Sequence, residues 1–300
     1  MADIKAINLN LDSQTNLRPA IHAWEQFLRD QGRSPNTIKS FLGDISLLVA
    51  FLPPDKMISD ISIDDLNSFL EWLKNGRGSK IPCSPKSFSR RITTIKSFFR
   101  WLSSRSIIPY DPAKKVLQSS VISPLPEVLL TDEINLILSA AESFMEKQKE
   151  DYRPYCLIKL VLETGIKKSE CIALKLNHLE ARTSQPFIFI RYPSLLDRNK
   201  ERKINISLRL LKVLESYIQQ YSIHDQIFAW SPRRLEYILE DIGNTVLISK
   251  HVSFSMLRWT CALEDLKNGI EPDQIRQKLG VSKIQWRELK MKLDQLLSQR

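Results

Sequence analysis

A regular row of cationic and small polar side chains runs along one expected helix in the N-terminal half of the chain. In the stretch "SPKSFSRRITTIKSFFRWLSS" its members recur at intervals of four, three, four and three residues. They are Lys86, Arg90, Thr93, Ser97 and Arg100. At this spacing they share one face of a helix, opposite the apolar Ile95. Cations repeated along a helix face can neutralise successive phosphates, so the row predicts contact with a nucleic-acid backbone.

The sequence around this row is basic throughout. Between Lys74 and Arg105 there are nine Lys or Arg residues and no Asp or Glu. A helix face that is merely solvated usually carries charges of both signs. The whole chain of 300 residues has a formal net charge of +10, which favours a polyanionic partner. A ribosomal or membrane-surface partner would fit the net charge alone equally well.

The composition is that of a folded protein with room for two domains. Hydrophobic residues make up 43% of the chain and charged residues 26%. The first residues lack the basic segment and apolar core of a signal peptide, and no apolar run reaches the roughly 18 residues of a membrane-spanning helix. We therefore expect a cytoplasmic, nucleoid-associated protein without a membrane partner.

The cysteines indicate neither a metal site nor a disulfide framework. Cys83, Cys156, Cys171 and Cys261 are scattered, with no C-x-x-C pair and no histidine at ligand spacing. We interpret them as small buried hydrophobic residues of a reduced protein. We expect no metal and no cofactor.

Hydrophobic periodicity predicts a helical first domain over residues 1–118. Apolar residues three and four positions apart mark helices in "HAWEQFLRDQG", "SPNTIKSFLGDISLLVAFLPP", "SIDDLNSFLEWLK" and the stretch that carries the cationic row. Ser34 and Ser84 are expected N-caps, each followed by a proline in the first helical turn. Ser62 and Asp65 form a capping-box pattern.

A second domain is expected over residues 128–300. The stretch "VLQSSVISPLPEVLL" is rich in Ser and Pro and lacks a period, which predicts a linker at residues 119–127. The second domain should begin with a helix capped by Thr131 and continue with helices in "YCLIKLVLETG" and "KSECIALKL". "FIFIRY" and "KINIS" predict a β-hairpin, after which helices return. The expected fold class is mainly α with a small antiparallel sheet.

The order of these pieces resembles the tyrosine recombinase (phage integrase) family, most closely its Xer-like members. "GRSPNTIKSFLGDISLLVAFL" and "SFSRRITTIKSFFRWLSSRSIIPYDPAKKV" are similar to the family's SAM-like, four-helix core-binding domain, which clamps one face of a DNA duplex. "LVLETGIKKSECIALKLNHLE", "RNKERKINIS" and "MLRWTCALEDLKNGIEPDQIRQKLG" are similar to signatures of its helical α/β catalytic domain. The resemblance implies a double-stranded DNA partner and a role in DNA recombination or integration.

The family's reaction requires a tyrosine that attacks a DNA phosphate, arginines that neutralise it, and a lysine and histidines that move protons. Glu170 matches the family's acidic residue. The resemblance assigns the catalytic positions to Lys167, Asp197, Ser255, Arg258, Val281 and Lys290. Of these, Arg258 alone keeps the family's residue type unambiguously. Lys200 or Arg198 is expected to stand in for the hairpin lysine that Asp197 replaces.

These replacements remove most of the chemistry that the resemblance implies. Lys167 keeps a charge but lacks the planar fork with which arginine grips two phosphate oxygens. Ser255 and Val281 stand where histidines are expected, and the valine side chain can neither donate nor accept a hydrogen bond. Lys290 stands at the nucleophile position, and no tyrosine follows Tyr237. We therefore expect that this chain does not cleave DNA by itself.

The resemblance extends the expected DNA surface beyond the cationic row. The expected DNA-contacting residues are Ser34, Asn36, Thr37, Lys39, Lys86, Ser87, Arg90, Arg91, Thr93, Ser97, Arg100, Lys167, Arg198, Lys200 and Arg258. The amphipathic segment "WRELKMKLDQLL" is interpreted either as docked on its own core or as exchanged between subunits. Exchange would make a second copy of this chain, or an active recombinase, a further partner.

The sequence also allows other functions. An active but diverged recombinase would use unusual residues or a partner's tyrosine, and strand cleavage of nicked DNA would reveal it. A protein-interaction module that has lost DNA binding would give no gel shift at low salt. Arg258 could instead be a structural arginine paired with Glu170.

Overall fold

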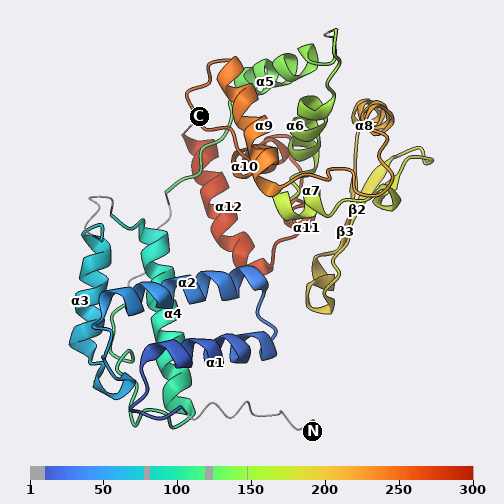
Figure 1. The fold of residues 1–300 in the computed structure, drawn as a ribbon. Coiled ribbons are helices and arrows are strands. Elements are labelled where there is room, and N and C mark those ends of the chain that lie inside the picture. Colours follow the sequence, from blue (N-terminus) through green and yellow to red (C-terminus); the bar gives the residue numbers. More distant parts are fainter. Residues whose placement is uncertain (1–10, 78–81, 119–123, 147, 300) are drawn as a thin grey trace. The chain divides into compact units, whose positions relative to one another are not determined.

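The computed structural model describes residues 11–77, 82–118, 124–146 and 148–299. The chain divides into two compact units, Met1–Ser123 and Pro124–Arg300 (Figure 1). Part of the expected linker, residues 119–123, lies outside the described residues. Both units are mainly helical, as the hydrophobic periodicity predicts.

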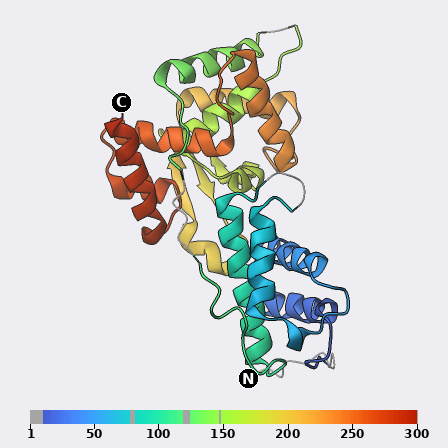
Figure 2. The same cartoon turned by 90° about the vertical axis from the view of Figure 1, so that its left-hand side faces the viewer.

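Unit 1 is a helical domain whose core is centred on aromatic rings. Its elements are α1 (Leu17–Asp30), α2 (Pro35–Phe51), a 3-10 turn (Ile58–Asp60), α3 (Ile63–Lys74) and α4 (Pro85–Ser104). Helix α4 packs against α2 and α3, and Figure 2 shows α3 and α4 side by side. The fully buried Trp24 contacts Phe98 edge-on with ring centroids 5.1 Å apart and stacks on Phe41 at 5.8 Å.

The expected caps of unit 1 are confirmed. The hydroxyls of Ser34 and Ser84 accept backbone N–H bonds in the first turns of α2 and α4, and a proline follows each cap. Ser62 and Asp65 form the capping box of α3. These bonds fix where each helix begins, because they satisfy N–H groups that lack a partner within the helix.

Unit 2 surrounds two central helices with further helices and a small sheet. Its elements are α5 (Thr131–Ser143), α6 (Arg153–Thr164), α7 (Lys168–Ile172), a 3-10 turn (Leu176–His178), β1 (Leu179–Glu180), β2 (Phe187–Ile190), a second 3-10 segment η3 (Leu195–Lys200), β3 (Arg202–Asn205), α8 (Leu208–Gln220), α9 (Pro232–Thr245), α10 (Phe254–Lys267), α11 (Pro272–Lys278) and α12 (Lys283–Ser298). Helices α6 and α10 pack against each other, and α6 also contacts α5, α8 and α9. The near-complete burial of α6 explains its apolar sequence.

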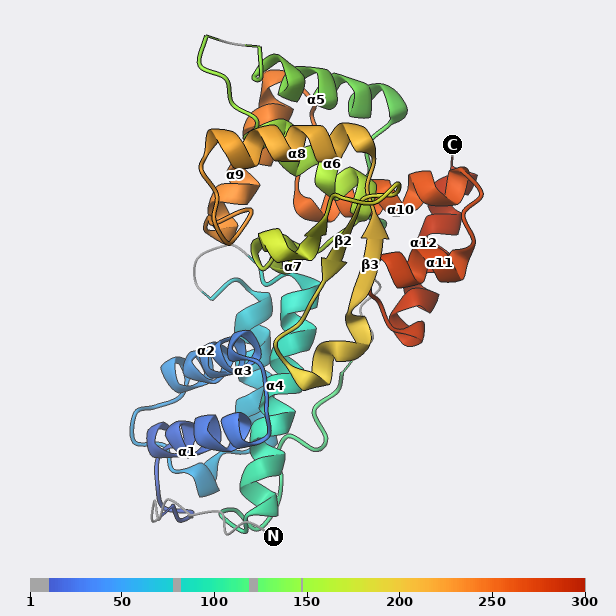
Figure 3. The same cartoon turned by 90° about the vertical axis from the view of Figure 1, so that its right-hand side faces the viewer.

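The strands form an antiparallel sheet in the order β1, β2, β3. The expected hairpin is confirmed: Ile188 pairs with Ile204 and Phe189 with Lys203. Figure 3 shows β2 and β3 side by side, and α11 contacts β3. The isoleucines face the core of the unit, which leaves the alternate residues on the other face of the sheet.

Some local expectations for unit 2 are wrong. The cap of α5 is Leu130, and Thr131 is already helical. The helix expected through "KSECIALKL" ends at Ile172, because the following residues bond across the chain: the Leu176 N–H donates to the Asp225 carbonyl, and the Ile227 N–H donates to that of Leu174. Strand β1 was not expected, since a segment of two residues shows no alternation.

The cysteines only partly match their expected burial. Cys156, Cys171 and Cys261 are buried, whereas Cys83 is half-buried in unit 1. The described cysteines are all free thiols. No helix in the described ranges is both long and apolar enough to cross a membrane.

Candidate functional site

The residues assigned to the catalytic positions all lie in unit 2, on different elements. Lys167 is the N-cap residue of α7, and Asp197 lies in η3 between β2 and β3. Ser255 and Arg258 belong to α10. Val281 lies between α11 and α12, and Lys290 on α12. The fold brings some of these side chains together and leaves others apart.

Arg258 ties two turns of the backbone together. Its guanidinium donates to the carbonyl of Gly165 and to that of Leu279, each at 2.6 Å. Burial lowers the pKa of Arg258, and the neighbouring Glu170 carboxylate opposes this shift. The hydrogen bonds of Arg258 in the structure thus go to backbone carbonyls. None of them goes to Glu170, with which a structural Arg258 was expected to pair.

Lys167 reaches the same turn as Arg258. Its ammonium donates to the carbonyl of Gly280 at 3.2 Å and lies 3.8 Å from a carboxylate oxygen of Glu170. Burial lowers the pKa of Lys167; Glu170 opposes the shift, while Arg258 and Arg202 add to it. The structure therefore places Lys167 and Arg258 at one cationic centre.

A buried ion pair lies at the heart of this centre. Glu170 accepts hydrogen bonds from both terminal nitrogens of Arg202, at 3.0 and 2.8 Å, and from the Lys167 backbone N–H at 2.8 Å. The side chains of Glu170 and Arg202 are 1% and 9% exposed. Burial alone would raise the pKa of Glu170, but the bonds and charge of Arg202 bring it below its ordinary value.

Arg202 was missed by the sequence interpretation. It is the first residue of β3 and also donates to the Lys278 carbonyl at 2.6 Å. Gly280 makes room for it, since a Cβ there would lie 2.5 Å from an Arg202 nitrogen, and Gly280 also has a positive φ of 59°. The only sequence signal was one more cation in "RNKERKINIS".

Tyr192 is a second functional group that the sequence interpretation missed. Its hydroxyl donates to Glu170. Burial and this bond to a carboxylate raise the pKa of Tyr192. A phenol in this setting is a hydrogen-bond donor that positions Glu170, because its phenolate form would face a neighbouring negative charge.

The hairpin residues pair with each other. The ammonium of Lys200 donates to the carboxylate of Asp197, three residues earlier. Lys200 also lies over the ring of Tyr192, with its nitrogen 6.0 Å from the centroid. Arg198, the other expected replacement for the family's lysine, is exposed.

The two positions where histidines are expected offer no proton-transfer group near the cationic centre. Ser255 is exposed in the first turn of α10. Val281 is half-buried and packs against the apolar cluster that includes Leu279 and Trp286. The backbone carbonyl of Val281 accepts a bond from Arg276 at 3.2 Å.

Lys290 lies on the outer side of the C-terminal helix. Its ammonium is bound by both carboxylate oxygens of Asp294, at 2.7 and 3.0 Å, in a pair one helical turn apart. Helix α12 buries Trp286, Leu293 and Leu296 against α10 and α11 of the same chain. Docking on its own unit is thus the arrangement seen for "WRELKMKLDQLL".

The cationic row of unit 1 lies along α4, and one of its arginines is paired with a buried aspartate of α2. Arg90 donates to Asp44 of α2 at 2.9 Å and is 40% exposed. Arg91 is only 12% exposed; it lies 3.5 Å from the same carboxylate and donates to the Cys83 sulfur. Burial raises the pKa of Asp44, whereas its bond from Thr94 and the two arginines lower it.

The remaining residues of the expected DNA surface are mostly accessible. Thr93 donates to the carbonyl of Ser89 and accepts from Gln118. Exposed residues of the set are Ser34, Asn36, Lys39, Lys86, Thr93 and Arg100, and half-buried ones are Thr37, Ser87 and Ser97. The expected DNA-contacting residues of unit 1 are therefore at least partly exposed to solvent, and Arg91 is the least exposed of the arginines among them.

No metal site is visible among the described residues. Within those ranges, no group of three or more His, Cys, Asp or Glu side chains is arranged to hold a metal ion. Lys167, Arg202 and Arg258 instead donate to the backbone carbonyls of Gly280, Lys278 and Leu279, respectively.

Two solved structures illustrate proteins that share this architecture. A lambda integrase dimer bound to a COC' core site superimposes with a TM-score of 0.72 at 16% identity, covering 93% of this chain and 78% of that chain. The XerH site-specific recombinase bound to a palindromic difH substrate superimposes with a TM-score of 0.70 at 17% identity, covering 93% and 83%. At these identities the likeness establishes the fold.

Sequence comparison identifies the family. Residues 127–286 match the phage integrase family, and residues 21–106 match the phage integrase N-terminal SAM-like domain. The chain is 23% identical over 265 residues to the tyrosine recombinase XerD of Listeria innocua, covering 84% of this chain and 86% of that protein. It is 24% identical over 279 residues to XerC of Lacticaseibacillus casei, covering 87% and 89%. The chain belongs to the phage integrase family of tyrosine recombinases.

Proposed function

We propose that this protein binds double-stranded DNA without cleaving it and acts as a regulatory, architectural or non-cleaving subunit of a recombination assembly. One observation carries the proposal: the nucleophile position that the resemblance assigns holds Lys290, whose ammonium is bound to Asp294 at 2.7 Å. An ammonium has no lone pair with which to attack phosphorus. The ion pair also holds the side chain along α12.

Tyr192 does not supply the missing nucleophile in this proposal. Its hydroxyl is engaged by Glu170, and burial with that bond raises its pKa. Deprotonation would set a phenolate against a buried carboxylate. Tyr192 therefore supports the cationic centre and does not attack.

The cationic centre is proposed to bind a DNA phosphate without activating it. Lys167 supplies a point charge and Arg258 a guanidinium that already donates to two carbonyls. Ser255 and Val281 add no acid or base to protonate a leaving oxygen. Binding and chemistry are thereby separated, because charge attracts the phosphate while the proton-transfer groups are missing.

Unit 1 is proposed to supply sequence-independent contacts to the DNA backbone. Lys39, Lys86 and Arg100 are exposed, and within the described ranges none of their side chains has an ion-pair partner. Arg90 contributes with its charge partly balanced by Asp44. We assign Arg91 to the support of Asp44 and not to DNA contact.

The test combines binding and covalent trapping on one nicked duplex. The protein should retard the duplex in a gel at low salt and leave no covalent protein–DNA adduct. Mixing with an intact recombinase of different mass should place any adduct on that protein alone. An adduct on this chain would show an active enzyme, and absence of any gel shift would favour a protein-interaction module.

A further inference from the structure

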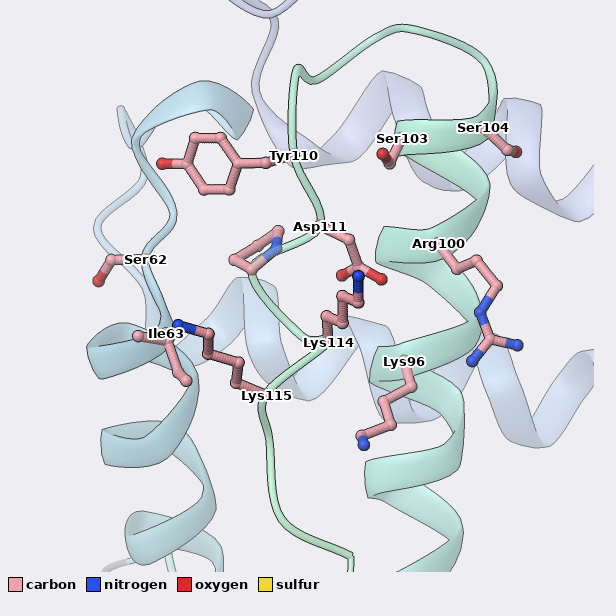
Figure 4. A pocket seen from close by; sticks show the side chains of 11 residues that line it. Ser62, Ile63, Lys96, Arg100, Ser103, Ser104, Tyr110, Asp111, Lys114 and Lys115 are labelled. Carbon is pink, nitrogen blue, oxygen red and sulfur yellow. The ribbon is translucent and has the colours of Figure 1, made fainter.

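Unit 1 contains a cationic hollow at one end of the row on α4. It measures about 860 Å³ and lies between the start of α3, the second half of α4 and residues 110–115 (Figure 4). Its cationic lining comprises Lys96, Arg100, Lys114 and Lys115. Of these, Arg100 alone was part of the expected DNA surface.

The charges around this hollow are unbalanced. Lys96, Arg100, Lys114 and Lys115 line the hollow together with one acid, Asp111, so the lining has an excess of three formal positive charges. No ion pair or hydrogen bond joins the side chains of these cations to another described residue. This contrasts with Arg90 and Lys290, each of which has a carboxylate partner. Cations gathered without counter-charge create a positive potential that an anion relieves.

The carboxylate of Asp111, the one acid of the lining, is hydrogen-bonded to the backbone. One carboxylate oxygen of Asp111 accepts the Ala113 N–H at 2.8 Å, and the Asp111 carbonyl accepts the Lys114 N–H. Asp111 thus shapes the turn that presents Lys114 and Lys115. Both lysines are exposed.

Hydroxyls and an apolar wall complete the lining. In Figure 4, Lys96 and Ser103 of α4 point toward the 110–115 segment, and Lys115 points toward Ile63. Ile63, Pro112 and the ring of Tyr110, which is 61% exposed, form the apolar part of the lining. A bare anion does not need such a surface, but a planar base can lie against an aromatic ring and its apolar neighbours.

We propose that this hollow binds a nucleotide through a chain of linked phosphates, with the lysines on the phosphates and Tyr110 beside the base. The same chemistry has two sources, a free nucleoside polyphosphate and a nucleic-acid strand. The volume lies in the range of small-ligand sites, and the number of cations suits more than one phosphate. The proposal goes beyond DNA binding by the α4 row, since it can hold whether or not the chain binds a duplex.

The first experiment measures binding of tripolyphosphate and of ATP to the full chain by calorimetry at low salt. The double variant Lys96→Gln/Lys115→Gln should bind tripolyphosphate and ATP about tenfold or more weakly than the wild type, because two charge-assisted contacts are lost. The matched control is Lys149→Gln with Lys212→Gln, which changes net charge equally at two exposed lysines of unit 2. The control should change affinity by less than about twofold, as expected for a screened, long-range effect.

Other outcomes overturn the proposal. Equal weakening by the pocket and control variants would show that net charge alone attracts the anion. Polyglutamate that binds as tightly as tripolyphosphate, with the same loss in the pocket variant, would show a site for acidic protein. No binding of either phosphate compound by the wild type would exclude the site.

The base and the source are tested separately. Tyr110→Ala should weaken the binding of ATP several-fold and leave the binding of tripolyphosphate unchanged. An equal effect on the two affinities would show that Tyr110 does not contact the base. Duplex DNA that displaces tripolyphosphate would identify a strand as the source, and simultaneous binding would identify a free nucleotide. Because the phosphate titrations contain no DNA, failure of duplex binding would leave their result intact.

Discussion

At the scale of single residues, a buried ion pair lies at the heart of the cationic centre. Arg202 and Glu170 are nearly inaccessible and are joined by two bonds, while Gly280 leaves space for the guanidinium. A buried pair of this kind gains little over an apolar pair of equal size, but loss of one member is costly. We infer that Arg202 organises the turn at residues 278–280, which Lys167 and Arg258 also contact.

Replacing Arg202 by Met should destabilise unit 2 by roughly 3–5 kcal/mol, since Glu170 would be left buried without its cation. Chemical denaturation followed by circular dichroism measures the loss. Adding Glu170→Gln to Arg202→Met should recover part of it, because the buried charge is then gone. A double variant no more stable than the single one would contradict this account.

Acid should diminish the contribution of Glu170 to stability. Its pKa is lower in the folded protein than its ordinary value of 4.5. The contribution is therefore complete above about pH 4.5 and is lost as the pH falls through the folded pKa. The difference in unfolding free energy between wild type and Glu170→Gln should be largest at neutral pH and narrow in acid. Glu288→Gln, at an exposed glutamate, is the control and should show a small difference at every pH.

Lys290→Tyr alone should not restore cleavage. The new phenol would still lack an arginine fork at Lys167 and proton-transfer groups at Ser255 and Val281, and groups of one active site act as a unit. Trapping of covalent adducts on nicked DNA measures the outcome. The informative comparison also carries Lys167→Arg, Asp197→Lys, Ser255→His and Val281→His. Adduct from the single variant would show that the retained residues suffice.

At the scale of elements, α4 has three kinds of face. One buries Ile95 and Phe99 in the core of unit 1, one carries the cationic row, and the adjoining edge lines the hollow with Lys96. The sequence around α4 contains no acidic residue, but Asp44 of α2, 46 residues before Arg90, forms an ion pair with it. The positive charge along α4 is therefore uneven, with Arg90 partly neutralised and Arg100 unpaired within the described ranges.

This unevenness predicts different salt effects for the two arginines. Arg100→Ala should reduce the slope of log affinity for duplex DNA against log salt by about 0.9, the value for one phosphate contact. Arg90→Ala should have a smaller effect, because Asp44 already offsets part of its charge. Gel shifts over a salt series measure both slopes, with Lys212→Gln as the charge-matched control. An unchanged slope for Arg100→Ala would remove α4 from the DNA surface.

At the scale of the whole molecule, two units with separate cores are joined through the region around residues 117–127. We propose that they act on one duplex, with unit 1 supplying backbone contacts and unit 2 the cationic centre. Among the described residues, each buried core cluster lies within one unit.

Limited proteolysis should cut first between residues 117 and 127, where the sequence is rich in Ser and Pro and lacks a period. Duplex DNA should slow that cut, because a ligand held by both units opposes the opening that a protease needs. Mass spectrometry of the fragments locates the cut. A cleavage rate unaffected by saturating DNA would mean that the units do not share the duplex.

The sequence by itself determined most of the helices, most of their caps, the hairpin and the presence of two mainly helical units. These features depend on neighbours along the chain: a Ser followed by Pro at a helix start, and apolar residues three or four positions apart. The same local information indicated the cationic row, because intervals of three and four place side chains on one helix face. The resemblance supplied the catalytic positions, but it could not say what each side chain contacts.

The tertiary structure alone decided which cationic side chains are exposed and which are buried or paired with a carboxylate. Arg202 looked like one more cation of a polar loop, yet packing against Glu170 and Gly280 buries it. Arg91 was expected to contact DNA, yet its side chain is only 12% exposed and lies beside Asp44. Lys96 of α4 and the adjacent Lys114 and Lys115 of the 110–115 segment come together only around the hollow. Ion pairing and burial depend on groups that are distant along the chain, so periodicity carries no information about them.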